Sequence, residues 1–416
     1  MDDAGLSALA PRPDHVPDAA VYDFDMYLDP GLLKDPHERV RQMLAEAPPV
    51  FWTQRNGGHW VAIGHDACYE VARDWERFSS EFMSRERLEA LLAMLPPDYP
   101  HIPRARPISL DPPDHGKYRA ALASTFGPRS VKALTGDIRD LAGQLIDAVA
   151  DKGACEFIGA VAEPLPVLVF LKMMGLPSDR LAEFRELVRK FLAPGLTDPM
   201  ESAGRMRSIA DAIGEAIRAR RDDPKDDLIS HLWKTEIDGE PMSLEIMEDF
   251  GVLLFLAGLD TVINAIGHAV RHMATHPDLQ AKLRADPSLI PEAVEEMLRR
   301  YSFVTLVRRV TADTEFHGWR LKAEDKVMFA TAGAGLDPAR WSAPETFDLT
   351  REDKTHIAFG VGPHRCAGSH LARLELHLLY AELLQRLPEF RLDPDRPVVY
   401  RAGNVLAVES LPIRWD

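Results

Sequence analysis

Phe359-Gly-Val-Gly-Pro-His-Arg-Cys-Ala-Gly368 is the most informative stretch of this 416-residue chain. A helical pattern over 369–387 follows it directly, so Cys366 is predicted to stand at a helix N-terminus. Unpaired backbone N–H groups and the helix dipole favour a thiolate over a thiol at that position. The glycines let the backbone turn tightly around the sulfur, and the proline stiffens the turn. A thiolate held among N–H donors is suited to bind a haem iron as its axial ligand.

The composition indicates one large globular unit. The chain is 46% hydrophobic and contains no low-complexity linker or internal repeat, so we expect a single domain over residues 1–416. A net charge of -16 argues against a nucleic-acid partner. We take a monomer as the expected state.

The N-terminus and the cysteines indicate a cytoplasmic protein. The first residues, 1–7, are acidic at Asp2 and Asp3 and lack the apolar core of a signal peptide. No run of about 18 uninterrupted apolar residues is present, so we expect no membrane association. Cys68 and Cys155 form no Cys-x-x-Cys pair with each other or with Cys366, which fits a reducing compartment.

Residue periodicity predicts a mainly α fold with minor β-sheets. The strongest strand signal is a hairpin over 49–63, where Asn56-Gly57 supplies the turn between two β-prone runs. Further short strands are expected at 303–310, 314–329, 398–402 and 405–408. Helical patterns cover much of the remainder, at 36–45, 65–74, 114–125, 129–152, 163–174, 178–192, 200–221 and 226–235.

The segment 91–110 does not fit this helical pattern. Five prolines exclude a regular helix there. Long irregular segments in compact domains usually have a function, so we expect this one to belong to a functional site.

A long apolar helix is predicted from Ser243, a candidate N-cap, to His276. Its centre is apolar on every face, which is typical of a helix buried through the middle of a protein. Asp260 and Thr261 lie within this run, where a buried carboxylate must find partners. The alternative, that the pair caps a helix N-terminus, is disfavoured by its predicted position in mid-helix.

Two of these motifs resemble signatures of the cytochrome P450 family. Phe359, Gly362, Cys366 and Gly368 match the family's haem-binding pattern Phe-x-x-Gly-x-x-x-Cys-x-Gly. The run Ala257–Thr261 resembles its oxygen-activating motif. For a lone cysteine the alternative is a buried structural residue. The resemblance implies the cytochrome P450 fold, haem b, and a haem-thiolate monooxygenase that uses O2 to hydroxylate an unactivated C–H bond.

The resemblance also implies roles for residues on the two sides of the haem. Cys366 would bind the metal, with Phe359 and Gly368 beside it. On the opposite side, Gly258 would let the helix open where O2 sits. Thr261 would hydrogen-bond to the bound oxygen, and Asp260 would relay protons to it.

Four basic residues are candidate partners of the haem propionates. His115 and Arg119 lie at i and i+4 on one predicted helix face, which suits paired contacts with carboxylates. The resemblance adds Arg308 and His364. For any one of these residues the alternative is a solvated or otherwise satisfied side chain.

Glu296 and Arg299 resemble the family's Glu-x-x-Arg pair, which lies on one helix face. The segment 337–348 resembles the region that packs onto this pair, and Arg340 is predicted to make the contact. We interpret all three residues as structural.

Further motifs are similar to those of camphor 5-monooxygenase and its relatives. They include Leu-Asp-Thr-Val at 259–262 and Ile-Ser-Leu-Asp-Pro-Pro at 108–113. This likeness implies a small apolar terpenoid or norisoprenoid substrate, resembling camphor or an ionone. It also implies electrons from a two-iron, two-sulfur ferredoxin, reduced by an NADH-dependent flavin reductase. The candidate substrate contacts are Tyr99, His101, Ile102, Leu253, Leu256, Ala257, Val304 and Thr305.

Departures from the group's pattern leave the substrate open. The tyrosine expected to bind a substrate ketone is best matched by Tyr99, which is offset, while Pro103 stands nearer the expected place. His101 is a candidate replacement donor. Leu306 stands where a propionate-binding aspartate is expected, and Arg365 replaces an apolar residue on the predicted ferredoxin face.

Two other functions remain open. One is a haem-thiolate enzyme driven by peroxide, or one that reduces NO or isomerises its substrate. The other is a haem-binding sensor or carrier without turnover. The Asp260–Thr261 pair argues against both, because neither function needs a proton relay linked to oxygen.

Overall fold

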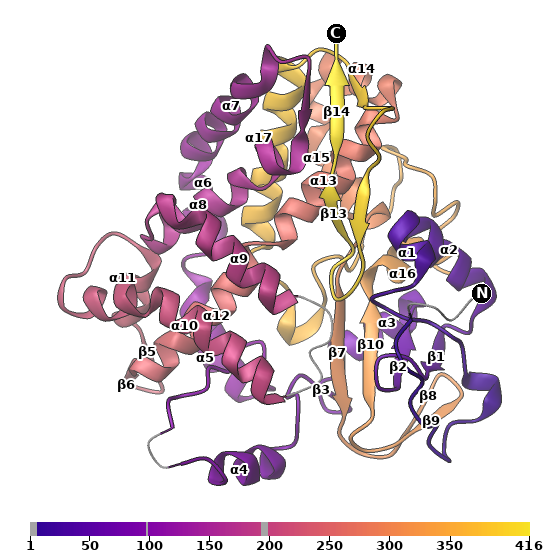
Figure 1. Cartoon of the computed structure of the whole chain (residues 1–416), viewed down its shortest axis with the longest axis vertical. Helices are drawn as coiled ribbons and strands as arrows, with labels where there is room; N and C mark the ends of the chain where they lie inside the picture. Colours follow the sequence, from indigo (N-terminus) through magenta and orange to yellow (C-terminus); the bar gives the residue numbers. More distant parts are fainter. Residues whose placement is uncertain (1–5, 97–98, 193–198) are drawn as a thin grey trace.

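A computed structural model describes residues 6–96, 99–192 and 199–416, and it confirms a mainly helical fold with small sheets (Figure 1). The longer helices are α2 (Pro36–Glu46), α3 (His65–Arg73), α4 (Arg85–Ala93), α5 (Asp114–Ala123), α7 (Thr135–Ala150), α8 (Pro164–Met174), α9 (Leu181–Leu192), α10 (Pro199–Asp222), α12 (Leu244–Gly258), α13 (Thr261–Ala274), α14 (Pro277–Ala285), α15 (Ile290–Arg300) and α17 (Ser369–Arg386). The short helices are α1 (Pro30–Lys34), α6 (Pro128–Ala133), α11 (Leu228–Trp233) and α16 (Thr331–Leu336).

The largest sheet has five strands in the order β1-β2-β10-β7-β3. The predicted hairpin is present and lies at one edge of this sheet. Its strands β1 and β2 pair in antiparallel register around a turn with positive φ at Asn56 and Gly57. Its bounds are β1 (Val50–Thr53), β2 (His59–Ala62), β10 (Lys326–Ala330), β7 (Thr305–Val310) and β3 (Phe78–Ser79).

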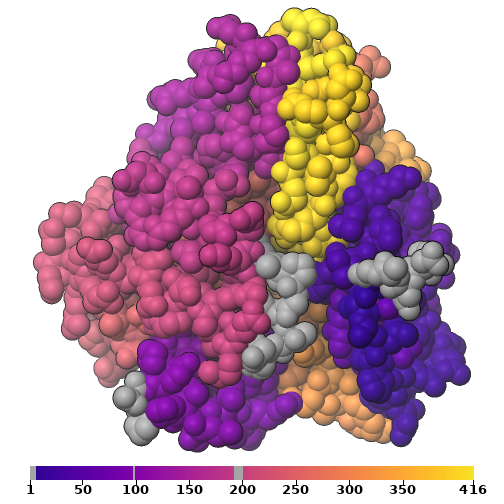
Figure 2. Space-filling model, viewed as in Figure 1, coloured from indigo at the N-terminus to yellow at the C-terminus, as the bar shows by residue number. Residues whose placement is uncertain are grey.

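The remaining sheets are small, and one joins distant parts of the chain. In it β14 (Pro412–Trp415) lies between β11 (Phe390–Leu392) and β4 (Ala154–Glu156). The yellow C-terminal strands accordingly lie between the magenta helices and the indigo N-terminal region in Figure 2. The others are the hairpins β12 (Val399–Arg401) with β13 (Ala407–Ser410), β8 (Thr314–Phe316) with β9 (Trp319–Leu321), and β5 (Glu236–Ile237) with β6 (Glu240–Pro241).

Helices α12 and α13 form the buried centre and contact α8, α10, α15 and α17. Ser243 caps α12 as predicted, since its side chain accepts a hydrogen bond from the Ile246 N–H. The 31-residue segment Leu244–Ala274 is long and apolar enough to cross a membrane by length and composition alone. Much of it is buried inside the molecule, as expected for the core helix of a globular protein.

The prediction of one continuous helix to His276 is wrong. The helix is interrupted at Leu259 and Asp260, and Asp260 occupies the N-cap position of α13 without capping it through its side chain. Side chains take backbone acceptors at the break: Thr261 Oγ1 donates to the Ala257 carbonyl at 3.1 Å, and Asn264 Nδ2 donates to the Asp260 carbonyl at 2.9 Å. Asp260 therefore lies at a helix N-terminus, as the capping alternative supposed, and not in the middle of a helix.

Other expected elements also differ from the structure. The strand expected over 314–329 forms three strands, β8, β9 and β10. The pattern over 129–152 forms two helices, α6 and α7, separated at Leu134. The proline-rich segment 91–110 begins inside α4, which ends at Ala93, and the described part that follows has no regular helix or strand. Pro97 and Asp98 of that segment lie outside the described residues.

Candidate functional site

The loop around Cys366 is closed by backbone hydrogen bonds. The Cys366 N–H donates to the Phe359 carbonyl at 2.8 Å, and the Arg365 N–H donates to the Gly362 carbonyl at 3.2 Å. Gly362 has a φ of 71°, and a Cβ there would lie 3.1 Å from the Cα of Arg73. Glycine is required at this position because both the left-handed backbone and the close contact with α3 exclude a side chain.

Cys366 lies two residues before the N-cap of α17, which is Gly368. Its side chain is accessible to solvent, although it lies deep in the protein. Burial raises the pKa of the Cys366 thiol, while the Gly368 N–H and the Arg119 guanidinium act in the opposite direction. The groups that were predicted to favour a thiolate are thus present, but burial changes the pKa of Cys366 more than they do.

An ion-pair network from α15 supports the Cys366 loop, and the sequence did not reveal it. Arg373 of α17 lies over the Phe359 ring, with its Cζ 4.5 Å from the ring centroid. Glu295 accepts from Arg373 at 2.6 and 2.8 Å and contacts His356 at 3.2 Å. Burial opposes ionisation of Glu295, but these two partners lower its pKa to about 2. Glu295 therefore fixes the guanidinium that holds Phe359.

The four predicted propionate ligands lie together. The rings of His115 and His364 are 4.3 Å apart, and Arg119 Nη2 donates to the Arg365 carbonyl at 2.6 Å. Burial first, and then Arg308, His115 and Arg119, lower the pKa of His364 to about 3. The structure thus gathers four basic side chains from α5, β7 and the Cys366 loop.

This group has the properties expected of a site for an anionic cofactor. Arg308 is buried, which lowers its pKa to about 10, and no carboxylate among the described residues lies within ion-pair distance of it. His364 Nε2 is buried and has no hydrogen-bond partner in the described part of the chain. Buried charges and donors of this kind require partners. The residues present therefore fit the carboxylates of a haem.

On the other side of the site, Asp260 is enclosed by both polar and charged groups. Its Oδ2 accepts from Asn264 Nδ2 at 3.2 Å, and its Oδ1 lies 3.7 Å from Arg401. Burial raises the pKa of Asp260, and the nearby Arg401 opposes that effect. The carboxyl is thus poised to hold a proton more readily than a solvated aspartate.

Ala257 is exposed near the C-terminal end of the buried core helix α12. Its neighbour Gly258 packs on Phe170, because a Cβ at Gly258 would lie 2.7 Å from the Phe170 ring. Two residues of the predicted site, Ala257 on one side and Cys366 on the other, are thus exposed rather than packed in the core. Gly258 is therefore needed for helix packing, and its role in opening the helix at the oxygen site stays a prediction.

The predicted substrate contacts lie on three elements. Leu253, Leu256 and Ala257 follow one stripe of α12, and Val304 and Thr305 lie at the start of β7. Tyr99 is exposed, while Ile102 and His101 are partly buried. His101 Nε2 is 2.9 Å from Asp249 Oδ1, so this ring is engaged by a carboxylate that sequence reasoning missed.

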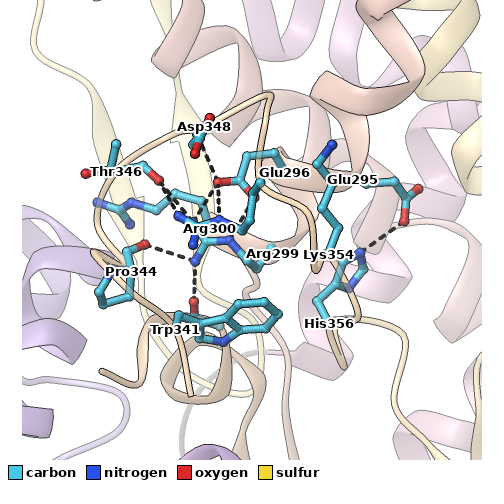
Figure 3. A network of polar contacts seen from close by, with 12 residues as sticks. Glu295, Glu296, Arg299, Arg300, Trp341, Pro344, Thr346, Asp348, Lys354 and His356 are labelled. Carbon is cyan, nitrogen blue, oxygen red and sulfur yellow. Dashed lines mark hydrogen bonds and ion pairs between the residues drawn. The ribbon is translucent and has the colours of Figure 1, made fainter. Parts of the chain in front are cut away.

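Glu296 and Arg299 form a fully buried ion pair, with Arg299 Nε donating to Glu296 Oε2 at 2.8 Å (Figure 3). Arg299 also donates to the carbonyls of Gly335 and Pro344 at 2.6 and 2.9 Å. The predicted contact with Arg340 is wrong.

Arg340 instead pairs with Asp353 and lies over the Trp341 ring. Arg351 takes the expected place, with its Nε 3.2 Å from Glu296 Oε1. Arg351 lies outside the segment 337–348, and no spacing rule connects it to Glu296.

Comparisons with known proteins identify the family. A family model described as cytochrome P450 matches residues 169–413. A protein named "Probable cytochrome P450 127A1" from Sinorhizobium fredii is 35% identical over 414 residues, covering 97% of both chains. A steroid C26-monooxygenase from Mycolicibacterium smegmatis is 33% identical over 410 residues, covering 95% of this chain and 96% of that protein.

Two solved structures match over almost the whole chain. CYP101J2 is 35% identical with a TM-score of 0.85, and CYP101C1 is 31% identical with a TM-score of 0.86. Each comparison covers 98% of this chain and 100% of the solved one. The chain therefore belongs to the cytochrome P450 family of monooxygenases, whose cofactor is haem b.

Proposed function

We propose that this cytochrome P450 hydroxylates an unactivated C–H bond of a small apolar terpenoid or norisoprenoid. The observation that carries the proposal is the likeness to CYP101J2 and CYP101C1 over 98% of the chain, together with the sequence motifs shared with camphor 5-monooxygenase and its relatives. Leu253, Leu256 and Ala257 share one apolar stripe of α12 and would give a substrate pocket the apolar wall that such a substrate needs.

Haem would supply the activation of O2 and the transfer of one oxygen atom to carbon. Cys366 would hold its iron, and His115, Arg119, Arg308 and His364 would hold its propionates. These contacts orient the cofactor and neutralise its two carboxylates.

Asp260 and Thr261 would manage the protons of the reaction. A buried carboxyl with a raised pKa exchanges a proton near neutral pH more readily than a solvated one. Arg401 and Asn264 keep that carboxyl beside the helix break, where the Thr261 hydroxyl lies next to it in the chain.

The redox partner and location form part of the same proposal. Members of the family need an electron donor, and we propose a two-iron, two-sulfur ferredoxin reduced by an NADH-dependent flavin reductase. We further propose a cytoplasmic monomer in which residues 1–416 act as one domain.

A steroid is the second candidate substrate. Relatives named steroid C26-monooxygenase are 33% to 36% identical over at least 88% of this chain. Their similarity favours a larger apolar substrate than the shared motifs do.

Titration of the ferric haem protein separates these substrates. Camphor, β-ionone and cholest-4-en-3-one would be added in turn while the Soret band is followed. The proposal expects a high-spin shift with camphor or β-ionone. A shift with the steroid alone would replace the terpenoid by a steroid, and a carbon monoxide spectrum without thiolate character would contradict the whole assignment.

The Thr261→Ala substitution separates monooxygenation from the peroxide-driven and sensor alternatives. Loss of the hydroxyl should lower the product formed per NADH by about tenfold and release hydrogen peroxide, because oxygen-linked proton delivery is impaired. Thr275→Ala is the control, since that hydroxyl also donates to a backbone carbonyl but lies at the opposite end of α13. Unchanged coupling in Thr261→Ala would favour the alternatives.

A further inference from the structure

The geometry points to Asp249 as a positioning residue that clamps the segment 101–106 onto α12 and so controls access to the substrate pocket. The inference rests on the proposed function for its meaning, because it concerns the pocket in which that substrate would bind. Asp249 touches neither the cofactor site nor the proposed oxygen site.

Asp249 is a fully buried carboxylate that receives two hydrogen bonds and one ion pair from one irregular segment. His101 Nε2 lies 2.9 Å from Oδ1, the Arg104 backbone N–H donates to Oδ1 at 2.8 Å, and Arg106 Nε forms an ion pair with Oδ2 at 3.0 Å. Buried carboxylates are stable only when they are paired and hydrogen-bonded. The pairing therefore fixes the segment to the helix strongly.

The backbone of the segment is shaped for this contact. Ala105, between the two arginines that contact Asp249, has a φ of 52° and is buried. A left-handed conformation at a residue with a side chain is unfavourable, because the Cβ comes too close to the following carbonyl oxygen. It brings the Arg104 N–H and the Arg106 side chain to one carboxylate, so Asp249 maintains a conformation that the free segment would not favour.

A second carboxylate ties the same segment to α10. Glu248, adjacent to Asp249 and also buried, accepts from Arg207 at 2.6 and 2.9 Å. Arg207 Nη1 also donates to the His101 carbonyl at 3.2 Å. Figure 1 shows the chain between α4 and α5 passing beside α10 and α12. Asp249 thus holds the segment directly. Glu248 holds it indirectly, through Arg207.

The clamp lies in line with the proposed pocket. Asp249, Leu253 and Ala257 recur at four-residue intervals and so share one face of α12. The segment that Asp249 holds contains His101 and Ile102, two of the candidate substrate contacts. Release of the clamp would therefore move one wall of the pocket while leaving Cys366 in place.

The test uses the haem-loaded Asp249→Asn protein. The amide keeps one acceptor oxygen, but it has an NH2 group in place of the other and no charge to pair with Arg106, so the clamp should open. Trypsin should then cut the Arg104–Ala105 bond at least about tenfold faster, because the released segment opens more often and exposes the bond. A tenfold change corresponds to about 1.4 kcal/mol. In stopped flow, 4-phenylimidazole should bind the haem faster by a similar factor.

Two controls separate a positioning role from general destabilisation. Asp211→Asn removes an exposed carboxylate that also pairs with Arg207 but not with the segment. Glu296→Gln breaks a buried ion pair elsewhere. Both should leave 4-phenylimidazole association at the wild-type rate.

The inference is overturned if Asp249→Asn matches the wild type in both measurements, or if Glu296→Gln accelerates 4-phenylimidazole association equally. Should Asp249→Asn fail to load haem, the double variant Asp249→Asn/Arg106→Gln leaves no buried unpaired guanidinium and is judged by the same two rates. Neither measurement needs a substrate, so failure of the terpenoid proposal would appear only in the ligand titration.

Discussion

Arg308 is a buried cation that the described protein leaves without a carboxylate partner, and its charge is therefore available to the cofactor. In Arg308→Gln we expect the dissociation constant for haem to rise by about ten- to a hundredfold, as a charge-assisted hydrogen bond contributes about 1.5–3 kcal/mol. The rate of haem transfer to excess apomyoglobin measures this loss.

The neighbouring Arg309 provides a matched control. It carries the same charge on the same strand but pairs with Glu324 at 2.7 Å. Arg309→Gln should retain haem as the wild type does. Equal loss of haem from both variants would show that Arg308 has no special role at the propionates.

At the scale of elements, the Glu296–Arg299 pair links α15 to the segment 335–346 through buried contacts. We expect Glu296→Gln to lower the free energy of unfolding by about 3–5 kcal/mol, because it leaves Arg299 buried without its counter-charge. Urea unfolding of the two proteins measures the difference.

Arg340→Gln is the contrasting variant, since Arg340 pairs with Asp353 near the surface. Its cost should stay within about 1 kcal/mol. A cost equal to that of Glu296→Gln would mean that the interior pair is not the link between these elements.

The contrast between Arg340 and Arg351 shows what the sequence could predict. The pair Glu296 and Arg299 is three residues apart, so helix geometry alone places both side chains on one face. Arg351 reaches Glu296 from a loop 55 residues later, and only the folded chain determines which arginine arrives there. Local spacing likewise located the hairpin and the Cys366 loop.

Partners that lie far apart in the chain were missed for the same reason. Asp249 meets the Arg104 N–H across 145 residues, and no local pattern marks a single buried aspartate as a clamp. The break at Asp260 was missed because apolar composition predicts burial but not helix continuity. Side-chain bonds to the backbone end the helix there.

At the scale of the whole molecule, buried histidines make stability depend on pH. Burial lowers the pKa of His268 to about 4 and of His272 to about 3, and it holds the pKa of His37 well below its usual value. The unfolded chain binds protons on these rings near pH 6.5 and the folded chain does not. Stability should therefore fall as the pH drops below about 6.5.

Each such histidine should lower the free energy of unfolding by about 1.4 kcal/mol for every unit that the pH falls between pH 6 and the pKa of the folded state. Glu375 acts in the opposite direction, because burial raises its pKa to about 8. His268→Gln isolates one ring: its unfolding free energy should decline less steeply than that of the wild type between pH 6 and 4. Parallel profiles for the two proteins would exclude this role for His268.

The position of β14 also determines when its sheet can form during synthesis of the chain. It comes after β4 and β11 in the chain, yet it is the central strand that both of them need as a neighbour. At about 5–20 residues per second, a ribosome reaches Pro412 about 10–50 s after it has made Glu156. Until β14 emerges from the ribosome, β4 has no partner in this sheet, so that edge of the nascent chain stays open. A stop codon in place of Pro412 should therefore yield chains that chaperones retain.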